Sequence, residues 1–485
     1  MPPHSVLHRW LPGAAQLPGF LAACSVSLVA CASDLKPSAP VERVLLITCD
    51  TLRADRLGAY GYAHPTTPHL DRFAKKSLVF DRAYSTAPMT TPAVSAIFTG
   101  RLPDELGVMN NKVQIAPAAI SMTEVISRAG IRTAAVLSNW VLARRGLEEA
   151  GLQQGFDHYD DTMTTREANR GHMFERDAAA TTDAALAWVK RQQDRRFFLW
   201  VHYQDPHGPY TPPEDCLSAL QRPLTAEPKL RVGQNQRGLG ELPRYQAIGE
   251  ERSPEAYRIR YDAEIRFFDR EVGRLLDGLE KRTLLENTLV VITADHGESL
   301  GERNFWFSHG QHLFDELVRV PFIVRYPRGC ARPSSAEDRG YRRVDRLVSH
   351  LDVMPTILDA FGLKGPQGYG QSLLRAELPE HRMVAHMGAG WFGVTDARHR
   401  CFSSRSSTHL YDVEKDPFET RNLAERDGTR VEEMLGRFEI LKRGLATVRL
   451  EGVAVNRDNA ELEALKALGY AGVDEDSGRS EEPGG

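Results

Sequence analysis

The sequence predicts an α/β fold, in which a mostly parallel sheet is sandwiched between helices and a smaller α+β subdomain follows at the carboxyl end. Short, continuous apolar runs recur as far as Gly362, as expected of strands that are buried on both faces. Segments with helical periodicity lie between these runs, and such alternation is typical of a parallel sheet covered by helices. With 485 residues, 41% of them hydrophobic and 26% charged, the chain can bury a large core.

The overall charge gives no reason to expect a nucleic-acid partner. Lysine and arginine number 61 against 65 aspartates and glutamates, which leaves a formal net charge of −4, and the sequence has no long basic run. Six cysteines are too few for a disulfide scaffold in a chain of this length, and none of them forms a C-x-x-C pair. The composition also argues against disordered, collagen-like and multi-span membrane proteins.

The amino terminus, residues 1–31, is predicted to be a lipoprotein signal peptide. Leu11–Ala30 is mostly apolar and small, but its prolines and glycines are poorly compatible with a transmembrane helix. Leu28-Val29-Ala30-Cys31 is similar to a bacterial lipobox, in which Cys31 would carry the lipid and residues 32–42 would form a polar tether. A lipid on Cys24 and a cleaved signal with two incidental cysteines are the alternatives. Lipidation would hold an exported protein at a membrane, facing the periplasm or the cell exterior.

The main domain is predicted to span residues 43–361 and to contain five buried strands. The five apolar runs are Val44–Thr48, Arg132–Leu137, Phe197–His202, Thr288–Thr293 and Pro321–Tyr326. Apolar residues between Ile265 and Leu279 follow the i, i+3, i+7 spacing of an amphipathic helix. Residues 213–253 are rich in Pro, Gly, Arg and Gln with weak periodicity, so we expect a surface insertion or a lid there.

The pattern changes to shorter, more polar elements after the main domain. We expect a carboxy-terminal subdomain over residues 362–472, with helices at Arg430–Lys442 and Ala460–Ala467. Residues 473–485 are acidic and rich in Gly and Ser, which predicts a disordered tail.

Acidic residues and a histidine follow two of the predicted strands. Asp50 comes directly after the first strand, and Asp295 and His296 come directly after the strand that ends at Thr293. Functional groups gather at the carboxyl ends of strands in such sheets, so these three side chains are candidate ligands of a divalent metal. An imidazole beside carboxylates favours zinc or manganese, although calcium or magnesium stays open. Asp50 as a helix cap and a metal-free polar loop at Asp295 are the alternatives.

Thr90 lies just before Pro92, near the start of an apolar helical stretch. A proline in the first turn and a preceding hydroxyl are typical of a helix amino terminus, which also stabilises anions. A hydroxyl at that point, lying on a divalent metal, can lose its proton and attack phosphorus or sulfur. An ordinary threonine cap is the alternative.

Together these residues resemble the sulfatase family of the alkaline-phosphatase superfamily. The similarity runs from about Val44 to Tyr470 and rests on five motifs in order along the chain. The motifs are Asp50–Tyr62, Asp205–Tyr210, Asp295–Glu298, Ser349–Thr356, and Leu410–Asp412 together with Asp416–Glu419 and Asn422–Ala424.

The resemblance implies a fold, a metal and a set of catalytic residues. The family has a large α/β domain followed by a smaller domain of antiparallel sheet and helix. By resemblance, Asp50, Asp295 and His296 bind the metal, and position 90 holds the nucleophile, which also contacts the metal. His207 is expected to contact the charged group of the substrate or to protonate the leaving group, and His309 matches a further active-site histidine. His202 and His312 are weaker candidates, and each histidine has a structural role as its alternative.

The sequence departs from the family at the nucleophile. Sulfatases carry a Cys/Ser-x-Pro-x-Arg motif whose first residue is oxidised to formylglycine, whereas this chain has Thr90 and Val94 at the two ends of the motif. Oxidation of the secondary alcohol of threonine would give a ketone and not the aldehyde. Thr51 also stands where many sulfatases have a second aspartate. A threonine nucleophile is instead similar to that of phosphoester-processing members of the superfamily.

The sequence therefore predicts a metal-dependent ester hydrolase that favours a phosphate mono- or diester. Its substrate would be an anionic ester, such as a lipid or glycan of the cell envelope. A sulfatase proper, a phosphoethanolamine-type transferase and a non-catalytic lipoprotein that binds anionic glycans are the alternatives. Transferases of that type usually sit on several membrane spans, which this chain lacks, so hydrolysis is preferred.

Overall fold

The computed structural model describes residues 41–454 except 145–149, 193–194, 235–236, 329–336, 339–341, 376–381, 389 and 446–449. The predicted signal peptide, residues 32–40 of the tether, the helix at 460–467 and the tail at 473–485 lie outside the described residues. Lipidation at Cys31 or Cys24 stays a prediction for the same reason.

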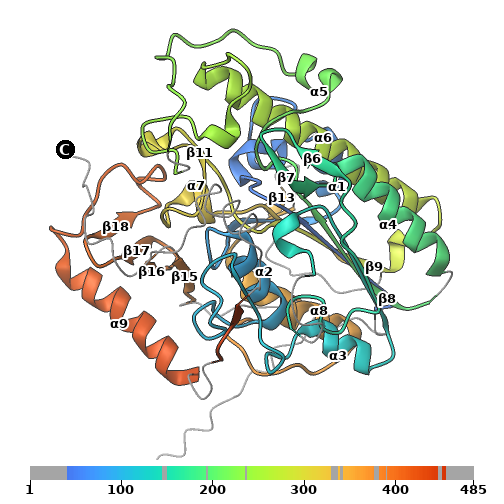
Figure 1. The fold of residues 1–485 in the computed structure, drawn as a ribbon. Coiled ribbons are helices and arrows are strands. Elements are labelled where there is room, and N and C mark those ends of the chain that lie inside the picture. The colour runs from blue at the N-terminus through green and yellow to red at the C-terminus, as the bar shows by residue number, and fades with distance from the viewer. Residues whose placement is uncertain are drawn as a thin grey trace, which may run out of the picture.

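A nine-stranded, mostly parallel sheet forms the centre of the molecule (Figure 1). Its strands β9, β1, β8, β4 and β5 run parallel to one another. Every residue of β1, β8 and β9 is buried, which explains why these strands are continuous apolar runs. The order across the sheet is β13 (Glu337–Asp338), β14 (Arg342–Ser349), β2 (Leu78–Tyr84), β12 (Phe322–Arg325), β9 (Thr288–Ala294), β1 (Arg43–Cys49), β8 (Phe197–Tyr203), β4 (Arg132–Leu137) and β5 (His158–Asp160).

All five predicted strands are present, but the fifth has the opposite direction to its neighbours. The run at Pro321–Tyr326 forms β12, which is antiparallel to both β2 and β9. An antiparallel neighbour needs no helical crossover, and β12 follows β9 in the chain without one that spans the sheet. The apolar pattern does not predict β2 and β14, because Asp81 and Arg82 interrupt the apolar run of β2 and charges are frequent in β14.

Helices cover both faces of the sheet (Figure 1). On one face α1 (Pro68–Ala74) and α4 (Ala178–Gln192) pack on α6 (Pro254–Glu280), and on the other α2 (Thr90–Thr99), α3 (Met122–Arg128) and α8 (Val353–Phe361) pack together. The predicted helix at 265–279 lies inside α6, which starts earlier because Ser253 caps it and Pro254 occupies its first turn.

The carboxy-terminal region is a four-stranded antiparallel sheet with one long helix beside it. The strands are β15 (Val384–Gly388), β16 (Trp391–Thr395), β17 (His399–Ser403) and β18 (Thr408–Asp412), and the helix is α9 (Gly428–Leu445). α9 contains the predicted helix at 430–442. Strand β15 lies against the segment that leads into α2, since Met387 N donates to Thr86 O at 2.8 Å.

The remaining elements are short. They are β3 (Val113–Gln114), β6 (Thr165–Glu167), β7 (Arg170–Glu175), β10 (Ser299–Leu300), β11 (Trp306–Ser308), β19 (Val453–Ala454), α5 (Glu214–Ser218) and α7 (Asp315–Val318), with seven 3-10 turns at 54–56, 58–60, 140–142, 244–246, 285–287, 302–304 and 350–352. Strands β6 and β7 form a hairpin, as do β10 and β11.

The expected insertion at 213–253 begins with α5 and then runs along β11. Trp306 N donates to Gly238 O at 2.8 Å, and Gln246 Nε2 donates to Phe307 O at 3.0 Å. The packing is close, because a Cβ on Gly208 would lie 2.0 Å from Gln246 Oε1. This part of the chain therefore covers the loop that carries His207.

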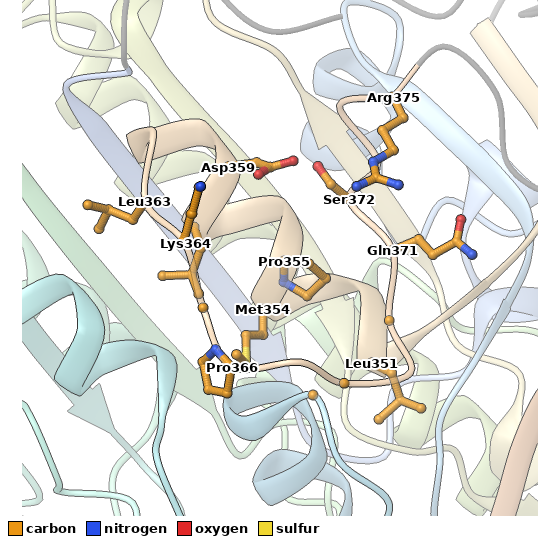
Figure 2. Close-up of a pocket in the computed structure, with 15 residues that line it drawn as sticks. Leu351, Met354, Pro355, Asp359, Leu363, Lys364, Pro366, Gln371, Ser372 and Arg375 are labelled. Carbon is orange, nitrogen blue, oxygen red and sulfur yellow. The ribbon is translucent and has the colours of Figure 1, made fainter. Parts of the chain in front are cut away.

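A hollow of about 310 Å³ lies between α8 and residues 363–372, on the far side of α8 from the sheet (Figure 2). Met354 and Pro366 lie together at one side of it, and Asp359, Ser372 and Arg375 at the other. None of the candidate site residues lines it. In the described part of the chain, no helix has the length and apolarity needed to cross a membrane.

Candidate active site

The register of the central strands brings Asp50 and Asp295 to one point. Cys49, the last residue of β1, lies opposite Ala294 at the end of β9. The next residues leave the sheet at the same edge, and Asp295 N donates to Cys49 O at 3.2 Å. Two carboxylates that are 245 positions apart in the chain are therefore neighbours at the carboxyl end of the sheet.

Asp50, Asp295 and His296 form a fully buried cluster. One potential ligand atom from each residue lies within 4.8 Å of the other two. His296 Nε2 is 3.5 Å from Asp50 Oδ1 and 3.7 Å from Asp295 Oδ2. Within the described residues these two carboxylate oxygens accept no hydrogen bond, although both are buried. Two buried carboxylate oxygens without hydrogen bonds carry negative charge that a bound cation would balance.

The other atoms of the cluster are held by the protein. Asp50 Oδ2 accepts a hydrogen bond from Asn139 Nδ2, and Asp295 Oδ1 accepts from His296 N at 2.7 Å and from Thr51 N at 3.3 Å. His296 Nδ1 is 2.9 Å from Gly297 O, so Nδ1 carries the proton and Nε2 presents its lone pair. Asp50 therefore does not act as the helix cap considered from the sequence.

The electrostatics of the cluster also fit a divalent cation. Burial, followed by the nearby charge of Asp295, raises the pKa of Asp50 well above its usual value, and burial raises the pKa of Asp295. Burial lowers the pKa of His296 to about 4, so its imidazole is neutral. Two carboxylates and one imidazole are a donor set suited to zinc or manganese.

Thr90 is the first residue of α2 and points at this cluster. Its Oγ1 lies 3.3 Å from His296 Nε2. The expected capping by a hydroxyl is absent: Met89 is the N-cap, and its side chain accepts no hydrogen bond. Asn111, which lies outside the helix, satisfies one N–H group of the first turn, because its Oδ1 accepts from Thr91 N at 2.8 Å. The Thr90 hydroxyl therefore does not cap the helix and faces the cluster.

Two positions depart from the family pattern, Thr51 beside the cluster and Val94 in the core. Val94 is completely buried within the hydrophobic core, so position 94 brings no cation to the site. Thr51 has a left-handed backbone, with φ of 54°, which is costly for a β-branched residue. Tyr261 holds this turn by donating its hydroxyl to Thr51 O at 2.7 Å, and the turn directs Thr51 N toward Asp295.

His207 and His309 extend the cluster. The His309 ring lies 4.6 Å from that of His296 and 5.1 Å from that of His207, between ring centroids. His207 Nδ1 is 2.8 Å from Gly208 O and donates to it, which leaves Nε2 as a proton acceptor. Burial lowers the pKa of His309 to about 3 and that of His207 well below its usual value, so both rings are neutral.

The contacts of the two weaker candidates in the described structure are with residues other than Thr90. His202 is buried in β8, where its Nδ1 and Thr48 Oγ1 are 2.7 Å apart and its ring packs on Trp200. The His312 ring packs edge-on against Phe305 and Phe314. These contacts support a structural role for both histidines.

Comparisons with known proteins identify the family of this chain. A family model for the sulfatases matches residues 42–363, which is about two thirds of the chain. The chain belongs to the sulfatase family. The central sheet, its helices and the antiparallel carboxy-terminal sheet form the alkaline-phosphatase-like fold of that family, whose members are ester hydrolases.

Curated relatives of this sulfatase-family chain include proteins with and without a known substrate. It is 26% identical over 428 residues to the uncharacterized sulfatase YidJ of Escherichia coli strain K12, covering 78% of this chain and 82% of the relative. It is 22% identical to the N-acetylglucosamine-6-O-sulfatase of Bacteroides thetaiotaomicron, covering 72% of each.

Two solved structures show the same fold. The phosphonate monoester hydrolase of Agrobacterium radiobacter superposes with a TM-score of 0.67 at 19% identity, covering 84% of this chain and 96% of that one. A protein in complex with its substrate D-glucosamine-2-N,6-O-disulfate superposes with a TM-score of 0.65 at 20% identity, covering 83% and 97%.

Several side chains at the site of this sulfatase-family chain were not predicted from the sequence. Asn139 bonds to Asp50, and Glu298 bonds to His309 Nδ1 at 3.1 Å and accepts from Tyr210 at 3.1 Å. Burial raises the pKa of Glu298 to about 8. Tyr245, from the segment that covers the site, stacks on His207 with ring centroids 6.4 Å apart. Glu298 and Tyr210 lie inside the motifs quoted from the sequence, but Asn139 and Tyr245 carry no local signal.

Proposed function

We propose that this sulfatase-family protein hydrolyses phosphate mono- or diesters, with Thr90 as the nucleophile. The observation that carries the proposal is the position of the Thr90 hydroxyl, on the first residue of α2 and 3.3 Å from His296 Nε2. Threonine cannot become formylglycine, and Val94 replaces the arginine of the sulfatase motif with a core side chain. Both departures favour phosphoryl over sulfuryl transfer.

We infer that Asp50, Asp295, His296 and Thr90 hold a divalent cation. Asp50 Oδ1, Asp295 Oδ2 and His296 Nε2 present free electron pairs to a common point, as described above. When bound, such a cation is a Lewis acid that draws charge from the phosphoryl oxygens and lowers the pKa of the Thr90 hydroxyl. Asn139 and the Gly297 carbonyl orient two of the ligand side chains.

The reaction then needs one proton relay. Thr90 Oγ1 attacks phosphorus in line, the new Oγ1–P bond forms, and the bond from phosphorus to the leaving oxygen breaks. The hydroxyl proton of Thr90 passes to Nε2 of His207 or His309, both neutral, and from there to the leaving oxygen. Water then attacks phosphorus and the Oγ1–P bond breaks, which releases phosphate from a monoester substrate or a phosphate monoester from a diester substrate. The water gives a proton to the same histidine, which passes it to Oγ1 and restores the Thr90 hydroxyl. The amino-terminal end of α2 stabilises the negative charge of the transferred group throughout.

We also propose that the segment within 213–253 acts as a lid. Thr90, Asp50, Asp295 and His296 are all fully buried, so an ester needs an opening to reach them. Tyr245 and Gln246 of this segment cover His207 and Gly208. Closure over the substrate would exclude water from the first step.

Sulfate ester hydrolysis is the second candidate, because curated relatives with 22% to 26% identity are named as sulfatases. A sulfatase of this kind would use Thr90, and not formylglycine, as its nucleophile. The two candidates differ only in which aryl ester the protein turns over faster.

A paired assay tests both candidates. Aryl phosphate monoesters, aryl phosphate diesters and aryl sulfates are compared on protein of measured metal content, as wild type, Thr90→Ala and Thr99→Ala. Thr99 lies in the last turn of the same helix and is the matched control. We expect Thr90→Ala to lower phosphate ester turnover by at least about a thousandfold, since it removes the nucleophile.

Equal turnover in wild type and Thr90→Ala would remove position 90 from the mechanism. A wild-type protein that cleaves the aryl sulfate faster than both phosphate esters would replace the phosphate proposal by the sulfate candidate.

A further inference from the structure

Arg170, the first residue of β7, is a buried cation beside the candidate site that the mechanism above does not use. Only 4% of its surface is exposed. Its Nε donates to Glu167 Oε1 at 2.8 Å, and its Nη2 donates to the same oxygen and to Gly208 O, the latter at 3.4 Å. Its Nη1 has no hydrogen-bond partner among the described residues.

The contacts of Arg170 place its guanidinium close to His207, through partners that the two side chains share. The carbonyl oxygen of Gly208 accepts from both Arg170 Nη2 and His207 Nδ1, so one atom joins the two side chains. The guanidinium carbon also lies 4.4 Å from the centre of the Tyr245 ring, and Tyr245 stacks on His207. The charge of Arg170 helps to lower the pKa of both His207 and His309, as expected of a cation within the same site.

Glu167 leaves one side of the guanidinium available. The carboxylate binds Nε and Nη2, which form one edge of the planar group, whereas Nη1 carries two further N–H donors on another edge. Buried donors without an acceptor cost free energy, so such groups are rare unless a ligand or water completes them. An acceptor is therefore expected at Nη1.

The site also lacks the cation that the sulfatase motif would supply, because Val94 lies in the core. An anionic ester still needs hydrogen-bond donors for its charged oxygens. We propose that Arg170 recognises the substrate, with its Nη1 donating to an anionic oxygen of the ester on the His207 side of the site. The proposal rests on the proposed function, since it assumes that the ester binds between Thr90 and His207.

This anionic oxygen has two chemical sources. It belongs either to the transferred phosphoryl group or to an acidic substituent, such as a carboxylate, on the leaving alcohol. Inorganic phosphate carries only the first, and a carboxyl-substituted aryl phosphate carries both, so the two ligands separate the sources.

The test uses two variants of the metal-loaded full chain and one control. Arg170→Lys keeps a cation for Glu167 but removes the Nη1 edge. The double variant Arg170→Gln/Glu167→Gln replaces the buried ion pair by neutral amides and avoids a lone buried carboxylate. Arg166→Gln, on the neighbouring strand of the same hairpin and exposed, is the control. Thermal unfolding selects variants that keep the wild-type fold.

Two measurements follow: calorimetric binding of inorganic phosphate, and kcat and KM for phenyl phosphate and 4-carboxyphenyl phosphate. If Arg170 holds the transferred group, phosphate binding weakens at least tenfold in both variants. If Arg170 holds the leaving group, KM rises at least tenfold for the carboxyl-substituted ester alone. In both cases Arg166→Gln behaves as wild type.

The inference is overturned if a folded Arg170 variant binds phosphate and both esters as the wild type does, which would show that Nη1 is satisfied by water. That result leaves the proposed function intact, because Thr90→Ala tests the nucleophile separately. Conversely, unchanged turnover in Thr90→Ala would contradict the proposed function, whatever the Arg170 variants do.

Discussion

At the residue scale, the cluster of Asp50, Asp295 and His296 depends on side chains that orient it. Asn139 is the clearest case, because it donates to Asp50 Oδ2 and so turns Oδ1 toward His296. Its own Oδ1 accepts from Val141 N at 2.8 Å, which fixes the amide. Groups that orient metal ligands affect metal affinity without touching the metal.

We expect Asn139→Ala to lower the affinity for a divalent cation by about ten- to a hundredfold. Metal content after dialysis against a graded chelator buffer measures this, with Asn422→Ala, in the carboxy-terminal region, as control. If Asn139→Ala keeps its metal up to the same chelator concentration as wild type, Asp50 does not need the hydrogen bond from Asn139 to bind the metal.

His312 gives a prediction for pH dependence at the same scale. Burial lowers its pKa to about 3, from an ordinary value of about 6.5, so the folded protein holds it neutral while the unfolded chain protonates it. Its contribution to stability is therefore complete above pH 6.5 and is lost as the pH falls from 6.5 toward 3. His312→Gln removes this loss.

The free energy of unfolding of wild type, taken relative to that of His312→Gln, should fall by about 1.4 kcal/mol for each pH unit below 6.5. Urea unfolding at pH 7.5, 6.0 and 5.0 measures it, and His64→Gln, at a partly exposed position, is the control. Parallel pH curves for wild type and His312→Gln would mean that His312 is protonated in the folded state. Turnover should change little, since His312 packs on Phe305 and Phe314 and not on Thr90.

At the element scale, α2 positions the nucleophile although its N-cap residue offers no side-chain hydrogen bond. Met89 cannot cap the helix, and Asn111 from a distant loop accepts the Thr91 N–H instead. The hairpin between β15 and β16 adds support, since Gly388 packs closely on Pro88, just before the helix. The first turn of α2 is thus fixed by two segments outside the helix, one of them 20 positions from Thr91 and the other in the carboxy-terminal sheet.

Asn111→Ala should lower the free energy of unfolding by about 1 to 2 kcal/mol, because it leaves the buried Thr91 N–H without its acceptor. It should also lower kcat with little change in KM, since the helix end that carries Thr90 loosens. Asn110→Ala is the neighbouring control, as the Asn110 side chain accepts from the local Lys112 N–H at 2.8 Å and forms no hydrogen bond with α2 in the described structure. A stable Asn111→Ala protein with normal kcat would show that α2 needs no partner at its start.

At the scale of the whole molecule, buried ion pairs join the carboxy-terminal sheet to the main body. Arg400 of β17 is completely buried and bonds to Glu419 at 2.8 Å and to Asp315 of α7 at 2.8 Å. Arg303 reaches the same loop by donating to Phe418 O at 2.9 Å. These contacts hold the carboxy-terminal region beside the segment that carries His309.

Arg400→Leu should cost about 3 to 5 kcal/mol of folding free energy, since the buried Glu419 loses its 2.8 Å ion pair and keeps the longer contact of 3.5 Å to Arg303. The double variant Arg400→Leu/Glu419→Leu should recover most of that loss, because two apolar side chains replace the pair. Chemical unfolding of the three proteins measures both effects. If the single variant is as stable as wild type, water reaches Glu419 and the interface is looser than the structure indicates.

The sequence predicted most of the central sheet because its strands are buried on both faces and so are continuously apolar. β1, β4, β8 and β9 lie within one residue of their predicted bounds. It missed β2 and β14, which are only partly buried and keep charged side chains, and it gave no sign that β12 runs antiparallel. Strand direction depends on the path of the chain between strands, which apolar patterning does not record.

For the site, the sequence by itself determined which residues stand at the ends of β1 and β9, and it placed Thr90 at the start of a helix. Those positions follow from local periodicity, because burial and backbone geometry act on neighbours in the chain. Only the tertiary structure decided that Asn139 contacts Asp50, that Glu298 contacts His309, and that Tyr245 and Arg170 lie beside His207. Hydrogen bonds and charge interactions act over a few ångströms of space regardless of separation in sequence.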